Sequence, residues 1–306
     1  MQRVVDISTD GLHLATLRGF LTVSAAGEEK GRVPLDDVGA LIVHAHGTTW
    51  SNTVMVRLSE RAIPVVICGA NHAPVACVWP LAGHHAQGAR MRAQLSAGRP
   101  LAKQLWRLVV AGKIRMQGEA LRFVGREGGA FEALARKVRS GDPENVEAQA
   151  ARRYWKAMFG SGFARDRQAE GINALLNYGY TVLRATASRA ICAAGLHPTI
   201  GIFHANRANA FALADDIMEP FRPIVDLVVV DLVANGVTAV TPDAKSRLAR
   251  IASADLAMPD ATVSPLDIAV QRLTHSLAVS FETGKPGLDL PVRPASVEAA
   301  DKDMDA

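Results

Sequence analysis

A histidine and several acidic residues stand close together in residues 201–226, GIFHANRANAFALADDIMEPFRPIVD. His204 lies in a short polar segment, and Asp216 and Glu219 follow in what reads as a largely apolar helix. Glu147, on another predicted helix, supplies a further acid. One imidazole and two carboxylates beside buried surface are side chains that hold a divalent metal ion. On a basic protein, such an ion indicates chemistry on nucleic-acid phosphates.

Each of these residues also has a simpler interpretation. Glu147 could be a solvated glutamate that pairs with a nearby arginine, because most helical glutamates face water. His204 could be an ordinary polar histidine between two helices, and Asp216 could complement the dipole of a helix N-terminus. Glu219 has apolar neighbours and needs a partner, either Arg222 or a metal ion. Spacing alone leaves these alternatives open.

Basic residues dominate a stretch of the chain that precedes the predicted acids. Between Gly83 and Arg126 the only acidic residue is Glu119. Side chains of this kind, spread over helices, can follow a phosphate backbone; the alternative is a solvated helical surface. The arginines that we predict to contact DNA are Arg90, Arg92, Arg152, Arg153 and Arg165.

Composition sets limits on the class of protein. The chain has 306 residues, of which 49% are hydrophobic, with a formal charge of +4. Three cysteines form no disulfide framework, and we find no leading hydrophobic signal, so we expect a cytoplasmic location. The apolar run at residues 227–230 is far too short to span a bilayer, and we expect no membrane partner. Phosphate-binding glycine motifs are absent, which argues against nucleotide use.

The elements that would position these side chains change in character along the chain. Short β-prone runs separated by glycines come first, and alanine- and leucine-rich helical patterns follow. We therefore predict an α+β protein with a small β-rich N-terminal domain (1–82), a larger all-helical domain (83–288) and a disordered tail (289–306). The predicted strands are 4–8, 13–17, 20–24, 40–44, 63–68 and 74–79, with a helix at 51–61. The predicted helices of the second domain are 87–95, 101–123, 129–139, 146–159, 169–194, 210–235, 243–254 and 265–282.

Four segments together resemble one known family, the CRISPR-associated integrases, which are the near-universal spacer-acquisition endonucleases, in the form that accompanies type II systems. VEAQAARRYW resembles the first acidic motif of that family and matches Glu147 to its acid. GIFHANRANAFALADD resembles the histidine motif, with His204, and DDIMEPFRPIVD resembles the last acidic motif, with Asp216 and Glu219. RQAEGINALLNYGY is also similar to the family. The resemblance extends to about Pro286.

The resemblance implies a metal-dependent DNA integrase and nuclease that inserts short foreign fragments into a CRISPR array. The 3′-hydroxyl of the fragment attacks a phosphodiester of the repeat. One Mg²⁺ or Mn²⁺ is held by the positions matching Glu147, His204 and Glu219. Family members form homodimers that assemble with a small second CRISPR-associated protein on double-stranded DNA. Arg222 is expected to orient Glu219.

Two other functions remain open on the sequence. One is a metal nuclease that cuts branched DNA without integrating it, and the other is a DNA-binding scaffold without catalytic activity. The integrase and the nuclease share their chemistry, because cutting and joining use the same kind of site. Tyr154, Tyr178 and Tyr180 are expected to pack or to contact DNA, and not to act as nucleophiles.

Overall fold

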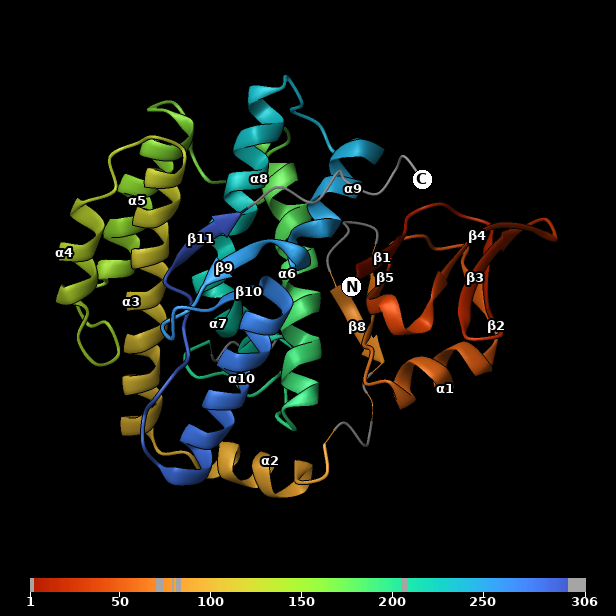
Figure 1. Ribbon diagram of the computed structural model, residues 1–306, viewed down its shortest axis with the longest axis horizontal. Coiled ribbons are helices and arrows are strands. Elements are labelled where there is room, and N and C mark those ends of the chain that lie inside the picture. The colour runs from red at the N-terminus through yellow and green to blue at the C-terminus, as the bar shows by residue number, and fades with distance from the viewer. Residues whose placement is uncertain (1–2, 70–73, 79, 81–83, 205–208, 297–306) are drawn as a thin grey trace.

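The computed structural model describes residues 3–69, 74–78, 80, 84–204 and 209–296. Strands occupy most of its first part and helices most of the rest, as predicted, and in Figure 1 the strand-rich first part lies to the right of the long helix α6 (Ile172–Ala193), which stands within the helical part. No helix in these ranges is long and apolar enough to cross a bilayer. The predicted linker at residues 80–83 lies mostly outside the described residues.

Two four-stranded sheets make up the N-terminal part. The first has the order β1-β5-β7-β8 and joins β1 (Arg3–Ile7), β5 (Val38–Val43), β7 (Val65–Cys68) and β8 (Pro74–Val78). The second has the order β4-β3-β2-β6 and joins β2 (Leu12–Leu17), β3 (Phe20–Ala25), β4 (Glu28–Pro34) and β6 (Thr49–Trp50). Helix α1 (Asn52–Glu60) buries Val54 and Leu58 against this part. The sequence did not predict β4, whose residues are mainly exposed and polar, or the short β6.

Strand β5 connects the two halves of the molecule. All six of its residues are buried. Leu41 and Val43 belong to the core of the N-terminal part, whereas Ala40 and Ile42 belong to the core of the helical part. Side chains of a strand alternate between its faces, so a strand covered on both faces reads as a continuous apolar run. The first sheet is therefore a shared wall and not the surface of a separate domain.

The helical part follows the predicted pattern closely. Its helices are α2 (Gln87–Ser96), α3 (Arg99–Phe123), α4 (Ala130–Lys137), α5 (Val146–Phe159), α6 (Ile172–Ala193), α7 (Ala212–Met218), α8 (Arg222–Ala234), α9 (Pro242–Ala249) and α10 (Leu266–Thr283). The central α6 has a mostly buried surface and contacts α7, α8, α9 and α10. The predicted long helix at 210–235 is wrong in one respect, because a 3-10 turn, Glu219–Phe221, divides it. Pro220 and Pro223 lack the amide donors that a continuous helix needs.

A third small sheet corrects the prediction for the end of the chain. Its order is β10-β9-β11, with β9 (Asp255–Ala257), β10 (Val263–Pro265) and β11 (Arg293–Ser296). The C-terminal part is therefore not all-helical, and the predicted disorder of 289–306 is wrong for residues 289–296. Composition suggested a loose tail, but pairing with β9 and contact with α3 hold β11. The remainder of the predicted tail lies outside the described residues.

Candidate metal centre

Glu147 stands in the first turn of α5, and that turn is tightly capped. Asn145 accepts a hydrogen bond from the backbone amide of Ala148. The Asp142 carboxylate accepts from the amides of Val146 at 2.9 Å and Glu147 at 3.0 Å. These bonds satisfy amides that a helix N-terminus leaves free. The cap fixes the backbone of Glu147, whose side chain keeps 25% of its surface exposed.

His204 is fixed by Asp216, a fully buried acid on α7. Asp216 accepts hydrogen bonds from the backbone amides of Ile202 at 2.5 Å and Phe203 at 3.1 Å, and its Oδ1 lies 2.6 Å from His204 Nδ1. Gly201 is required here, because a Cβ at that position would lie 2.6 Å from the His204 carbonyl oxygen. Asp216 therefore organises the segment that carries the histidine.

The same contact sets the tautomer and charge of His204. The hydrogen bond to Asp216 raises the pKa of the imidazole, and burial opposes that rise. When Nδ1 carries the proton and donates a hydrogen bond to Asp216, Nε2 keeps a free lone pair. A neutral imidazole of this form binds metals. Trp106 on α3 packs edge-on against the imidazole, with ring centroids 5.8 Å apart. Phe203 stacks on the same Trp106 at 4.3 Å.

Glu219 opens the 3-10 turn between α7 and α8, and its carboxylate lies between two cations. Its Oε1 is 3.0 Å from Arg222 Nε, and its Oε2 is 2.5 Å from Lys113 Nζ. Burial alone would raise the pKa of Glu219, but Arg222 and Lys113 outweigh burial and lower the pKa to about 2. Oε2 is buried and makes no well-directed hydrogen bond with any described residue. Charge therefore holds the contact with Lys113, and Arg222 forms an ion pair with the other oxygen of the carboxylate.

Lys113 brings the two predicted glutamates together. Its Nζ lies 2.6 Å from Glu147 Oε1 as well as 2.5 Å from Glu219 Oε2. Among the residues that the structure describes, no three histidine, cysteine, aspartate or glutamate side chains surround a common point closely enough to hold an ion. The shared cation between Glu147 and Glu219 is instead an ammonium group, and His204 is close enough to Glu219 for each to shift the other's pKa.

This donor set fits a hard divalent cation. Two carboxylates that converge on one positive charge, and an imidazole nitrogen beside them, are ligands that Mg²⁺ and Mn²⁺ accept. The ammonium of Lys113 lies against the pair of oxygens that such an ion would bind. Glu147, His204 and Glu219 are the residues that would hold the metal.

Lys113 lies in the basic stretch at residues 83–126, and its contact with the two acids was not predicted from the sequence. Its position on the helix indicates a buried side chain. It shares one face of α3 with four buried residues, which are Trp106, Val109, Val110 and Gln117. A lysine at such a position needs an acid as partner. The basic stretch was judged by composition, and composition does not distinguish the faces of a helix.

A second buried acid, Asp226 on α8, was also missed. It accepts hydrogen bonds from the hydroxyls of Tyr154 at 2.8 Å and Tyr180 at 2.5 Å. The guanidinium of Arg222 lies over the Tyr180 ring, 4.7 Å from its centroid. Burial raises the pKa of Tyr154 and Tyr180 well above the ordinary value, and Asp226 adds to the rise. These tyrosines belong to the interior network that supports Arg222.

The third tyrosine of the sequence reading belongs to a different contact. The hydroxyl of Tyr178 donates to Asp6 Oδ2 at 2.6 Å, which links α6 to β1. Burial raises the pKa of Tyr178, and the Asp6 carboxylate raises it further. This tyrosine therefore joins the two halves of the molecule.

The arginines predicted to bind DNA fall into two groups. Arg92, Arg152 and Arg153 are exposed. Arg90 is buried and bonds to Glu282 and to the Ala194 carbonyl, so its guanidinium is used inside the protein. Arg165 bonds to Asn173 and Asn177. Arg90 and Arg165 therefore bind partners within the protein in this conformation. Of the five predicted arginines, Arg92, Arg152 and Arg153 are the exposed ones.

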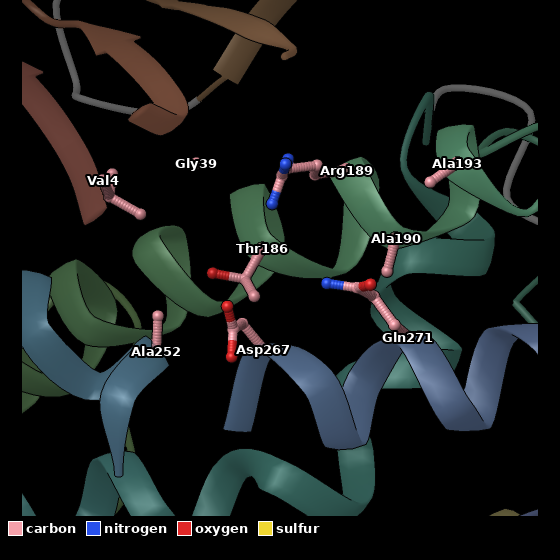
Figure 2. A pocket seen from close by; sticks show the side chains of 9 residues that line it. All are labelled: Val4, Gly39, Thr186, Arg189, Ala190, Ala193, Ala252, Asp267 and Gln271. Atoms are coloured by element: carbon pink, nitrogen blue, oxygen red, sulfur yellow. The ribbon is translucent and has the colours of Figure 1, made fainter. Parts of the chain in front are cut away.

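A pocket elsewhere in the molecule is separate from this site. It lies where β1 and β5 meet α6 and α10, and Figure 2 shows Val4, Thr186, Arg189, Asp267 and Gln271 around it. None of the predicted metal ligands lines it. The candidate centre is instead built where α3, α5 and the α7–α8 turn meet.

Comparison with known proteins gives one consistent family. The family model described as CRISPR associated protein Cas1 matches residues 5–248. The CRISPR-associated endonuclease Cas1 of Neisseria meningitidis is 36% identical over 243 residues, covering 78% of this chain and 79% of that protein.

Solved structures of low sequence identity share the fold. A casposase bound to integration product superposes with a TM-score of 0.77 at 19% identity, covering 98% of this chain and 96% of the other. A chain of a Cas6-RT-Cas1–Cas2 complex gives a TM-score of 0.71 at 18% identity, covering 93% of this chain and 35% of that one.

Proposed function

The chain belongs to the CRISPR-associated Cas1 family, and on that premise we propose that it is a divalent-metal-dependent DNA integrase and endonuclease of CRISPR adaptation. It joins short foreign DNA fragments to the CRISPR array by attack of a fragment 3′-hydroxyl on a repeat phosphodiester. The observation that carries the proposal is the convergence of Glu147 and Glu219 on one cation beside His204. The named activity of the Neisseria relative, an endonuclease, agrees with it.

Each residue has a distinct task in this mechanism. Glu147, His204 and Glu219 would hold Mg²⁺ or Mn²⁺, and the ion would supply Lewis acidity toward the attacked phosphate and the leaving oxygen. Asp216 keeps His204 in the tautomer with Nε2 free. Arg222 pairs with Glu219 and helps to hold its carboxylate in place.

No side-chain nucleophile is required, because the DNA supplies the attacking hydroxyl. Tyr154 and Tyr180 are unsuited to that role, since both are buried and both donate to Asp226. The protein therefore acts mainly by placing two DNA strands against a preorganised charge. The exposed Arg92, Arg152 and Arg153 are the candidates for phosphate contacts that hold the DNA.

We also propose a homodimer that works with a small second CRISPR-associated protein of the Cas2 kind. A structure with the same fold is part of a complex that contains Cas2. Light scattering after gel filtration measures the dimer, and mixing with the second protein on fragment DNA measures the larger assembly. Monomeric protein under all of these conditions would contradict this part of the proposal.

The deciding experiment is an assay of DNA joining in vitro. A short duplex with free 3′-hydroxyls is incubated with a supercoiled plasmid that carries a repeat, with Mn²⁺ or with EDTA, and with or without the second protein. We expect joined product only with metal, and a loss of at least about a hundredfold for Glu147→Gln. Glu144→Gln is the matched control, because Glu144 stands three residues away with its side chain 52% exposed.

Each result separates one function from the others. Metal-dependent cutting of branched DNA without any joining would favour the nuclease alternative. DNA binding without cutting or joining, even with the second protein, would favour the scaffold. Full activity of Glu147→Gln would overturn the site assignment, whatever the function.

A further inference from the structure

Lys113 has surroundings unlike those of the other bases discussed above. It stands on the buried face of α3, its side chain is only 12% exposed, and two acids share its ammonium group. Burial lowers the pKa of Lys113, but Glu219 and Glu147 outweigh that effect, so the amine is held charged. A buried ammonium between two carboxylates on different helices is a built contact and not a chance surface pair.

The four charged side chains in direct contact here balance one another without a metal ion. Glu147 and Glu219 contribute two negative charges, and Lys113 and Arg222 contribute two positive charges. A divalent ion bound to both carboxylates would add two further positive charges next to Lys113. Cations at such close range repel strongly in a partly buried site. The ammonium of Lys113 and a divalent ion therefore compete for the same two carboxylate oxygens.

We propose that Lys113 is an internal counter-ion that a divalent metal must displace from Glu147 and Glu219. The inference deepens the proposed function and rests on it, because it concerns the same metal ligands. Before metal binds, the ammonium keeps the two carboxylates facing each other and prevents their repulsion. When metal binds, the ammonium gives up these oxygens. Lys113 is thus a positioning residue that preserves the shape of the site and weakens its affinity for metal.

Two consequences of opposite sign separate this role from simple packing. Removing the charge should destabilise the metal-free protein, because the two carboxylates would then face each other without a cation between them. It should also tighten metal binding, because the competitor is gone. A residue that only filled space would lower both metal affinity and stability when replaced.

The test measures metal binding directly, without DNA and without activity. Metal-free full-length protein is titrated with Mn²⁺, and the free ion is followed by its electron paramagnetic resonance signal. We expect Lys113→Met to bind Mn²⁺ at least about tenfold more tightly than the wild type, since one adjacent charge changes such equilibria by about ten- to a thousandfold. Thermal melts in EDTA should show a lower Tm for the variant, and added Mn²⁺ should raise its Tm more than that of the wild type.

Matched variants isolate the charge. Lys113→Arg keeps a cation and should stay close to wild-type affinity. Lys103→Met removes an exposed lysine from the same helix, about 15 Å along its axis, and should change nothing. Lys113→Gln, which retains a polar group, provides the measurement if Lys113→Met does not fold, and it should also bind Mn²⁺ more tightly.

The outcomes distinguish this inference from the function on which it rests. If the wild type binds Mn²⁺ and Glu147→Gln loses it, but a folded Lys113→Met or Lys113→Gln binds no more tightly, the counter-ion role is wrong and the metal site stands. If the wild type binds no Mn²⁺, or Glu147→Gln binds it equally well, the proposed metal site fails and the inference fails with it.

Discussion

Glu219 and Asp226 lie at almost the same depth in the protein, at 4% and 1% exposure, and their carboxylates meet opposite surroundings. Glu219 meets two cations, and these lower its pKa to about 2 although burial acts in the other direction. Asp226 meets two phenol hydroxyls, and burial raises its pKa to about 6 although those hydrogen bonds oppose the rise. Burial sets the cost of a charge, and the partners decide whether the acid stays ionised.

The difference assigns the two acids to different tasks. An acid that stays ionised over the whole physiological range is suited to hold a metal ion. An acid whose pKa lies near 6 is a poor ligand but a good acceptor for two tyrosines. Arg222 connects the two regions, because it contacts Glu219 and stacks on Tyr180.

The largest effect should come from removing the ionised acid. Glu219→Gln leaves the buried cations Lys113 and Arg222 without their shared partner, and we expect a loss of about 3 to 5 kcal/mol in the free energy of unfolding of the metal-free protein. Urea unfolding at neutral pH measures it. The double variant Glu219→Gln/Lys113→Met should recover part of the loss, because one unpaired cation is also removed. Strict additivity of the two single variants would show that the two side chains do not interact.

The pH dependence of stability should separate the two acids next. The folded-state pKa of Asp226 is raised from 3.8 to about 6, so the folded protein binds this proton more tightly than the unfolded chain. Stability from this group is therefore greatest below about pH 4 and falls as pH rises to about 6, by about 3 kcal/mol in total. Glu219 behaves in the opposite sense, because its pKa is lowered from 4.5 to about 2 and its contribution is lost only as pH falls through that range.

The check is a series of urea midpoints between about pH 5.5 and pH 6.5, a window in which folded Asp226 titrates while Glu219 is ionised in both the folded and the unfolded protein. Asp226→Asn should flatten the dependence of the urea midpoint on pH in that window. An unchanged slope in the variant would mean that other groups produce it.

A smaller effect should follow from removing one hydroxyl of the Asp226 network. Tyr154→Phe should cost about 1.5 to 3 kcal/mol, the usual contribution of a hydrogen bond to a charged group. It should also raise the pKa of Asp226 further, because the lost bond favours the ionised form. The fall in stability would then extend to higher pH in the same urea series. Phe131→Leu, which alters a neighbour of Tyr154 without touching the hydroxyl, should leave the pH range of the slope unchanged.

The smallest effect should come from cations at the surface, in contrast to the two buried ones. Arg152→Ala should change the free energy of unfolding by no more than about 0.5 kcal/mol. In a DNA-binding titration against salt, it should reduce the slope of log K against log salt by about one if Arg152 contacts a phosphate. Arg90→Ala should instead lower stability, since Arg90 is buried and bonds to the Ala194 carbonyl and to Glu282. A reversal of these two results would show that burial does not separate DNA contacts from structural arginines here.

Local patterns carried much of the correct prediction. The predicted helix at 146–159 has the bounds of α5, because the helical pattern lies within the segment itself. The strand-rich beginning and the helical remainder were also recognised, and the family resemblance, now confirmed, came from motif order along the chain. Errors arose where a distant partner decided the outcome. Residues 293–296 form a strand only because β9 is there to pair with them.

The sequence by itself determined which residues are able to do chemistry, since residue type, motif order and helical period are properties of the chain. Glu147, His204 and Glu219 were predicted as metal ligands in this way. Only the tertiary structure decided what stands between them, because α3, α5 and the α7–α8 turn meet through packing of segments far apart in the sequence. It placed Lys113 between the two acids, made Asp216 the support of His204, and gave Glu219 and Asp226 opposite pKa shifts. Such effects depend on distance and desolvation, and these arise only when the chain is folded.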